Sequence, residues 1–151
     1  MIIDISIKLP CNAKDAYREV KTLRLLNQVT YPIIKFTPLD IFSPEQALQE
    51  RPYLMNTKLF GIFPTGIHTM VFSYQSTENF LVMRDNGYSR LCKKWDHKMT
   101  FEAQSDGTLY SDYADIRAGL FTPLVWLFAQ AFYRYRQRRW YKLSKLGFEY
   151  P

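Results

Sequence analysis

One hairpin pattern constrains the fold of this chain more than any other feature. The segment Lys94–Ala103 alternates polar and apolar side chains, and a second patterned segment, Thr108–Arg117, follows the dipeptide Asp106-Gly107. Alternation with a period of two is typical of a strand with one buried face, and Asp-Gly accepts the positive φ angles of a tight turn. The pattern therefore predicts an antiparallel hairpin whose first strand is Ser89–Ala103.

The expected turn also predicts how the two strands pair. A two-residue turn at Asp106-Gly107 places His97 opposite Ile116. The same register places Phe101 opposite Asp112. His97 and Asp112 would then share a face but lie four residues apart along the ladder, roughly 13 Å at the rise of a strand. We therefore expect no direct contact between these two side chains.

The chain on either side of this hairpin predicts further strands of an antiparallel meander. Tyr53–Phe60 and Ile67–Gln75 flank the loop Gly61–Gly66, and Asn79–Arg84 precedes Asn86-Gly87. Asn-Gly is a strong hairpin signal, so we expect a second tight turn there. The loop Gly61–Gly66 carries two large apolar residues and is predicted either to cover a cavity, to touch a membrane or to fold back onto a helix.

The N-terminal third mixes strands and helices. Ile3–Leu9 alternates as a strand, and Ala13–Asn27 follows with helical spacing after Asn12, a suitable N-cap. Tyr31–Thr37 is predicted as a second strand. Ser43–Glu50 is predicted as a short helical turn, with proline at its first position.

The last predicted element is a long helix, Thr122–Leu146. Thr122-Pro123 suits a helix start, and Gly147 suits a C-cap. The buried stripe is expected to contain Leu124, Leu127, Phe128, Ala131 and Tyr135. Strand, helix, meander and terminal helix in this order predict one α+β domain over residues 1–151, with six or seven curved antiparallel strands wrapped around the long helix.

Three segments carry a resemblance to a known superfamily. They are Asp106–Tyr113, with its G-T-x-x-x-D strand, Ala118–Leu120 before the terminal helix, and the loop Leu59–Gly66. In them and in its order of elements, the chain resembles the SRPBCC superfamily, the helix-grip proteins that include START lipid-transfer domains, birch-pollen-type allergens and bacterial polyketide cyclase/dehydrase-like proteins. The resemblance implies a helix-grip fold with a ligand cavity between sheet and helix. No catalytic residue of the superfamily matches a position here, so none is carried over.

The alternation predicts which side chains face that cavity. The expected turn at Asn86-Gly87 also places Phe80 and Val82 on the inward face of their strand. Aromatic residues make up 17% of the chain, which favours a ring-lined cavity. The predicted ligand-binding side chains are Tyr53, Met55, His68, Met70, Phe72, Tyr74, Trp95, His97, Met99, Phe101, Tyr110, Asp112 and Phe128. The alternative is that these side chains are simply part of the hydrophobic core.

The primary hypothesis is therefore binding of a hydrophobic or amphipathic small molecule, lipid-like or polyketide-like. The alternative is a cyclase- or dehydratase-like enzyme that uses His97 or Asp112 as acid or base. Two histidines and two cysteines without ligand spacing predict no metal site, and no motif predicts a cofactor. The oligomeric state is left open.

The charge of the chain suggests another kind of partner. The net charge is +6, and Arg134, Arg138 and Lys142 recur at four-residue spacing on the terminal helix. This stripe is either a solvated helix face or a binding surface for an anionic membrane or a nucleic acid. Of these two partners, nucleic acid is the less expected. The N-terminus lacks the basic region and cleavage site of a signal peptide, so a cytoplasmic location is expected.

Overall fold

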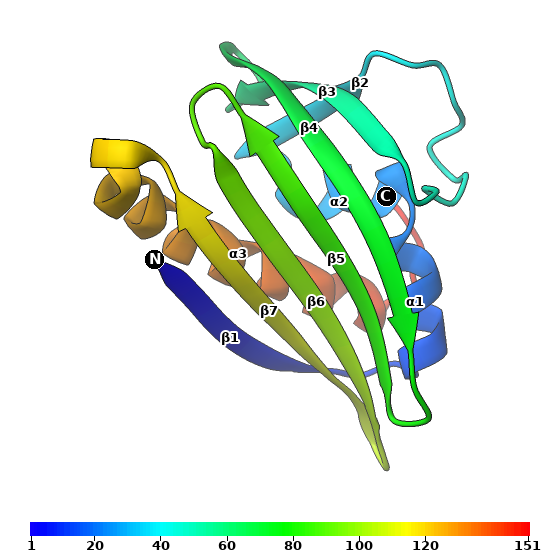
Figure 1. Cartoon of the computed structure of the whole chain (residues 1–151). Coiled ribbons are helices and arrows are strands. Elements are labelled where there is room, and N and C mark those ends of the chain that lie inside the picture. The colour runs from blue at the N-terminus through cyan, green and yellow to red at the C-terminus, as the bar shows by residue number, and fades with distance from the viewer.

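The computed structural model describes residues 1–151, which form one curved antiparallel sheet with helices on one of its faces (Figure 1). The sheet has seven strands in the order β1-β7-β6-β5-β4-β3-β2. The strands are β1 Ile2–Leu9, β2 Ile34–Pro38, β3 Pro52–Leu59, β4 Phe63–Ser76, β5 Phe80–Ser89, β6 Lys94–Gln104 and β7 Gly107–Arg117. The helices are α1 Ala13–Val20, α2 Leu23–Thr30, the 3-10 turn η1 Gly119–Phe121 and α3 Thr122–Lys145.

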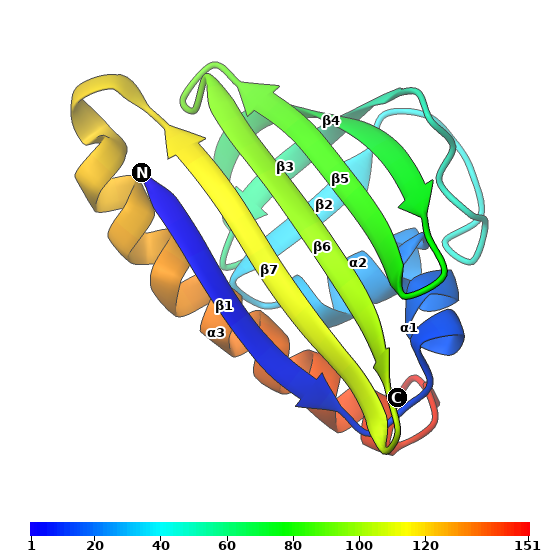
Figure 2. The same cartoon turned by 60° about the horizontal axis from the view of Figure 1, so that its bottom comes forward.

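The predicted α+β helix-grip-like arrangement is confirmed. The long helix α3 lies along the sheet on the side of β1 and β7, while α1 and α2 occupy the opposite part of the same face (Figure 2). The sheet is open, because β1 and β2 are its two edge strands. No helix is long and apolar enough to span a bilayer.

The β6–β7 hairpin forms as predicted, but its turn comes one residue earlier. Gln104 pairs with Gly107, so the turn residues are Ser105 and Asp106. Moving the turn by one residue shifts the pairing by two, and a shift of two keeps every side chain on its predicted face. His97 consequently lies opposite Ala114.

The predicted turn at Asn86-Gly87 is wrong, because both residues lie inside β5 and pair with β6. Gly87 is needed for space. A Cβ there would lie 2.6 Å from Nε2 of His68 and 3.1 Å from the carbonyl oxygen of Thr69. The error also reverses the predicted face of β5: Phe80 is exposed and Val82 is half-buried, whereas Met83 and Asp85 are buried.

Two helical predictions are also corrected. The single helix Ala13–Asn27 is two helices, since Thr22 leaves the helical conformation and its hydroxyl oxygen accepts a hydrogen bond from the N–H of Leu25 as the N-cap of α2. The segment Ser43–Glu50 forms no helix and instead makes an isolated bridge from Ala47 to Thr22.

The buried stripe of α3 differs from the predicted one, since Leu124, Leu127 and Ala131 are exposed. Trp140 orients the helix because it is fully buried, with its ring 5.8 Å from Phe101 between centroids. The buried residues of α3 are Ala129, Phe132, Tyr133, Arg136, Gln137, Trp140, Leu143 and Ser144. A charged and an amide side chain therefore lie on the core side of this helix.

The space between sheet and helices holds two apolar clusters. The larger cluster joins α1, α2 and the C-terminal half of α3 to the sheet around Trp140. The smaller cluster joins the N-terminal half of α3 to β1 and β7 around Phe132 and Tyr133. The two clusters leave an unfilled space at one end of the molecule, and this space is the candidate site.

Candidate ligand-binding site

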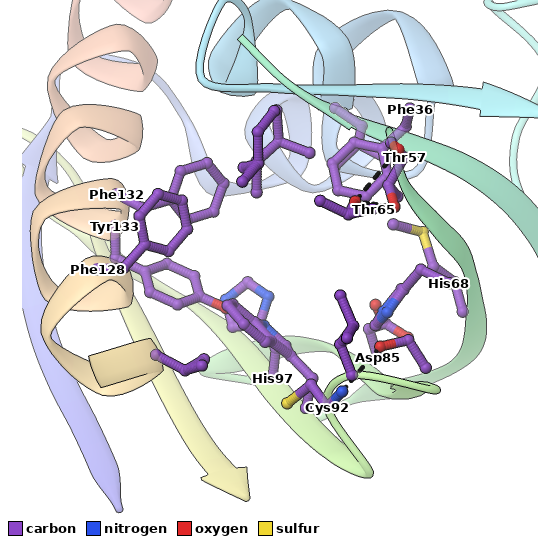
Figure 3. A pocket seen from close by; sticks show the side chains of 18 of the residues that line it. Phe36, Thr57, Thr65, His68, Asp85, Cys92, His97, Phe128, Phe132 and Tyr133 are labelled. Atoms are coloured by element: carbon purple, nitrogen blue, oxygen red, sulfur yellow. Dashed lines mark hydrogen bonds between the residues drawn. The ribbon is translucent and has the colours of Figure 1, made fainter. Parts of the chain in front are cut away.

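A cavity of about 230 Å³ lies between the first half of α3, α2 and strands β2 to β6 (Figure 3). Its lining consists of Leu26, Ile34, Phe36, Thr57, Leu59, Thr65, His68, Met70, Asp85, Ser89, Leu91, Cys92, Trp95, His97, Val125, Phe128, Phe132, Tyr133 and Arg136. The mouth lies at the β5–β6 turn, where Leu91 lines the cavity and is also 66% exposed to solvent.

The cavity has an apolar side and a polar side. The rings of Phe128 and Phe132 stack with their planes 9° apart and form a wall contributed by α3. Across the cavity, side chains of the sheet strands include His68 and Asp85 (Figure 3). An apolar body and a polar group of one ligand would therefore meet different walls.

The structure separates the predicted binding residues into two groups. His68, Met70, Trp95, His97 and Phe128 line the cavity. The others lie outside this lining, because α1, α2 and the C-terminal half of α3 cover their part of the sheet; they are Tyr53, Met55, Phe72, Tyr74, Met99, Phe101, Tyr110 and Asp112. Phe72 and Met99 instead face a deeper void of about 30 Å³.

Asp85 is a buried carboxyl group in the cavity wall. It is 7% exposed, and its only hydrogen bond comes from the N–H of Val71, which donates to Oδ1 at 2.9 Å. Burial raises the pKa of Asp85 to about 7, and the Val71 hydrogen bond and the charge of Arg136 offset only part of that rise. This carboxyl group therefore changes its charge near neutral pH.

His68 lies beside Asp85 across the β4–β5 pair. Nε2 of His68 and Oδ1 of Asp85 lie 2.6 Å and 3.2 Å from the position that a Cβ of Gly87 would take. Burial lowers the pKa of His68 to about 4, so its imidazole is neutral at pH 7. A neutral imidazole donates one hydrogen bond through one ring nitrogen and accepts one through the other.

His97 contacts Asp112 directly, contrary to the prediction. In the observed register Asp112 lies opposite Met99, so it is a diagonal neighbour of His97, and Nε2 of His97 lies 2.7 Å from Oδ1 of Asp112. Oδ1 of Asp112 also accepts a hydrogen bond from the hydroxyl of Tyr110 at 2.6 Å. Its Oδ2 accepts one from Nε2 of Gln137 at 2.9 Å. Both carboxylate oxygens of Asp112 thus have hydrogen-bond partners, and the side chain lies behind the cavity wall.

The buried guanidinium of Arg136 is the counter-ion of this group. Nη1 of Arg136 lies 3.6 Å from Oδ1 of Asp112 and 3.4 Å from both ring nitrogens of His97. Burial by itself would raise the pKa of Asp112, but the charge of Arg136 and the hydrogen bond from His97 lower it below its usual value. Burial also lowers the pKa of His97. At pH 7 the group is therefore an ion pair, Arg136 with Asp112, bridged by a neutral histidine.

Sequence reasoning missed Asp85 and Arg136. Asp85 carries a usable signal, since it follows Leu81 and Met83 at two-residue spacing in an otherwise apolar set. Arg136 lies seven residues from both Ala129 and Leu143, and so on the buried helix face, but long charged side chains are seldom fully buried, so this spacing alone does not single it out.

The cavity lining includes two histidines, one aspartate and one cysteine. No group of three His, Cys, Asp or Glu side chains is arranged to hold a metal ion. The thiol of Cys92 donates to the carbonyl oxygen of Lys94 at 3.2 Å, and burial raises its pKa. Of the two candidate acid–base residues, His97 lines the cavity and Asp112 does not.

The predicted basic stripe is exposed. Arg134, Arg138 and Lys142 lie on the outer face of α3, where the guanidinium of Arg134 donates to the side chain of Gln130. Leu124 and Leu127 occupy the start of the same face. One face of the helix therefore passes from apolar at the cavity mouth to basic further along.

Comparison with solved structures defines the class of fold. A START superfamily protein from Mycobacterium smegmatis superposes with a TM-score of 0.64 at 13% sequence identity, covering 96% of this chain and 97% of that one. A protein from Chromobacterium violaceum has a TM-score of 0.64 at 14% identity, covering 95% and 96% of the two chains. A hypothetical protein from Helicobacter pylori has a TM-score of 0.68 at 8% identity, covering 95% and 88%.

These similarities show that the chain has the START-like fold over nearly its whole length, as its sequence pattern predicted. At this level of identity the similarity concerns the fold alone. No family model and no curated protein matches the sequence.

Proposed function

We propose that this protein binds a hydrophobic or amphipathic small molecule in the cavity between the sheet and α3. The observation that carries the proposal is the cavity itself, about 230 Å³ in volume and walled mainly by aliphatic and aromatic side chains. Apolar groups that leave water for such a site gain about 25 cal/mol per Å² of buried surface. The START-like fold supports a small-molecule role in general terms.

The size of the cavity limits the ligand. Cavities for drug-sized ligands usually measure about 300–1,000 Å³, so this one suits a smaller molecule, of one or two rings or a short acyl chain. Phe128 and Phe132 would pack against the rings or the chain, while His68, Asp85 and His97 would meet its polar end. Binding roles for His68, Met70, Trp95, His97 and Phe128 are part of this proposal, supported by their places in the cavity lining.

Native mass spectrometry of the protein purified from cells tests the proposal. We expect a mass above that of the bare chain, with the excess released on denaturation. Val125→Trp should fill part of the cavity and abolish the excess, because Val125 lines the cavity. Leu120→Trp, which adds the same side chain at a site that is 98% exposed, should retain it. Equal occupancy in both variants would contradict the proposal.

A second candidate function, contact with an anionic membrane, is favoured by the surface around the cavity mouth. Leu120, Phe121, Leu124 and Leu127 are between 63% and 98% exposed at the start of α3. Ile62 and Phe63 of the β3–β4 hairpin and Leu91 of the β5–β6 turn are also exposed, and these three segments lie at the same end of the molecule (Figure 1). We call these seven residues the apolar rim.

The charge next to the apolar rim favours an anionic bilayer. The α3 face that begins with Leu124 and Leu127 continues into Arg134, Arg138 and Lys142. Apolar side chains inserted in the interface next to basic ones are typical of peripheral membrane contact, and each basic residue near an anionic surface contributes about 1 kcal/mol. Such contact would place the cavity mouth at the source of an apolar ligand.

Cosedimentation with phosphatidylcholine vesicles containing phosphatidylglycerol tests this contact. We expect the protein to sediment with these vesicles and less with pure phosphatidylcholine. Leu124→Glu combined with Leu127→Glu should abolish sedimentation, whereas Ile41→Glu, at a fully exposed apolar residue outside the rim, should not. Absence of wild-type binding, or binding unaffected by the paired change, would exclude the rim as a membrane contact.

A further inference from the structure

We propose that the cavity selects a ligand with a protonated amine on an aromatic or other apolar body, and that Asp85 is the anionic partner of that amine. The inference rests on the proposed function, since it names the class of ligand that the same cavity would take. Three observations carry it: the unused oxygen of Asp85, the balance of buried charges and the aromatic walls.

The first observation concerns the geometry of Asp85. One of its oxygens, Oδ1, accepts a hydrogen bond from Val71, while Oδ2 accepts none, and the carboxyl lines the cavity. Buried carboxylates normally fill their acceptor sites, because an unpaired buried charge is costly. Gly87 packs directly against this part of the wall, because a Cβ there would lie 2.6 Å from Nε2 of His68 and 3.2 Å from Oδ1 of Asp85. A ligand group that donates a hydrogen bond would therefore pair with the unused Oδ2 of Asp85.

The second observation concerns charge. Arg136 is the only buried cation at the cavity, and it lies 3.6 Å from Asp112, while its Nη2 donates to the sulfur of Met99. Since Asp112 already neutralises Arg136, ionised Asp85 is an uncompensated negative charge. The titratable groups that face Asp85 are His68 and Tyr74 from β4, His97 from β6, and Tyr133 and Arg136 from α3, while Asp96 acts on it from the outer face of β6, where it pairs with Arg84. The residues of α2 at this position, Leu25 and Leu26, are apolar.

The third observation concerns the rings around the cavity. Phe36, Trp95, Phe128, Phe132 and Tyr133 line it. Aromatic faces attract a cation with about 0.5–2 kcal/mol, more when water is excluded. A ligand carboxylate would meet the charge of Asp85 and be repelled, and a neutral alcohol would leave that charge uncompensated. The walls and the charge therefore favour the same ligand class.

Isothermal titration calorimetry with three probes of one shape tests the inference. The probes are 2-(1-naphthyl)ethylamine, 2-(1-naphthyl)ethanol and 3-(1-naphthyl)propanoate, each titrated at pH 6 and pH 8. The amine stays protonated at both values. We expect the amine to bind most tightly, with a Kd about tenfold lower at pH 8, because only ionised Asp85 is competent and its pKa is about 7. The alcohol should show no such dependence.

Variants separate the carboxyl group from the rest of the cavity. Asp85→Asn keeps the size of the side chain and should reduce the affinity for the amine to that for the alcohol at both pH values. Asp115→Asn removes a carboxylate that pairs with Lys94 on the outer face of the sheet, and it should leave all three affinities unchanged. The pH dependence of the wild-type protein tests the same point without any substitution.

The outcomes distinguish this inference from the proposed function. Equal binding of amine and alcohol, or tightest binding of the carboxylate, would overturn the role of Asp85 while leaving small-molecule binding intact. Binding of no probe, together with a clean apo mass in native mass spectrometry, would overturn both. Tight binding of the amine that survives Asp85→Asn would place the anionic partner elsewhere and contradict the inference.

Discussion

Replacement of Asp85 by asparagine is expected to stabilise the protein, and the gain should increase with pH. Burial raises the pKa of this carboxyl from 3.8 to about 7. An acid whose pKa is higher in the folded state binds more protons folded than unfolded, so stability falls as pH rises between the two values. The loss is complete above the folded pKa, and it is absent below the unfolded one.

The size of the effect follows from the same values. Between pH 5 and pH 8 the wild-type protein should lose about 3 kcal/mol through this group, since the slope is about 1.4 kcal/mol per pH unit at pH 5 and falls to zero above the folded pKa. Asparagine cannot ionise, and its Oδ1 can still accept from Val71. The stability advantage of Asp85→Asn over wild type should therefore grow by about 3 kcal/mol between pH 5 and pH 8.

Urea denaturation of both proteins at these two pH values measures the change. Asp115→Asn serves as the control, because the hydrogen bond from Lys94 lowers the pKa of Asp115. Stability from that group is present above the unfolded pKa and is lost only in acid, so the control should show no growth between pH 5 and pH 8. An advantage of Asp85→Asn that is constant with pH, or that shrinks as pH rises, would refute the reasoning.

Further substitutions test other parts of the structure. Gly87→Ala should cost about 1–3 kcal/mol in urea denaturation, because its Cβ would lie 2.6 Å from Nε2 of His68; unchanged stability would refute the close packing. Asp112→Ala should cost about 3–5 kcal/mol by leaving Arg136 buried without its counter-ion, and a smaller loss than about 1 kcal/mol would show that the ion pair is not buried as described. Trp140→Ala should cost about 3–5 kcal/mol, measured in the same way, since the ring is fully buried; a surface-like change would contradict its central place in the core.

Local patterns were sufficient to predict the fold because strand alternation and turn chemistry survive small errors in register. The β6–β7 turn was misplaced by one residue, yet Met99 and Phe101 kept their predicted inward face. The distance between two particular side chains on neighbouring strands, in contrast, changes with such a shift in register. The shift of two residues brought His97 into contact with Asp112 where the sequence predicted a separation of roughly 13 Å.

The candidate site was less predictable because its polar residues contradict general tendencies. Asn86-Gly87 is a common turn pair, but here Gly87 makes room for His68, and the false turn assigned the wrong face to β5 and concealed Asp85. Arg136 is buried because Asp112 pairs with it from the sheet. That contact joins α3 to β7 across the core, so no local pattern shows it.

A crystal structure of the protein with 2-(1-naphthyl)ethylamine tests the central claim, ligand binding in the cavity, most directly. We predict the naphthyl ring between the cavity walls, against Phe128 and Phe132, with the amine within hydrogen-bonding distance of Asp85. An empty cavity at saturating probe, or a probe bound only on the outer surface, would contradict the account.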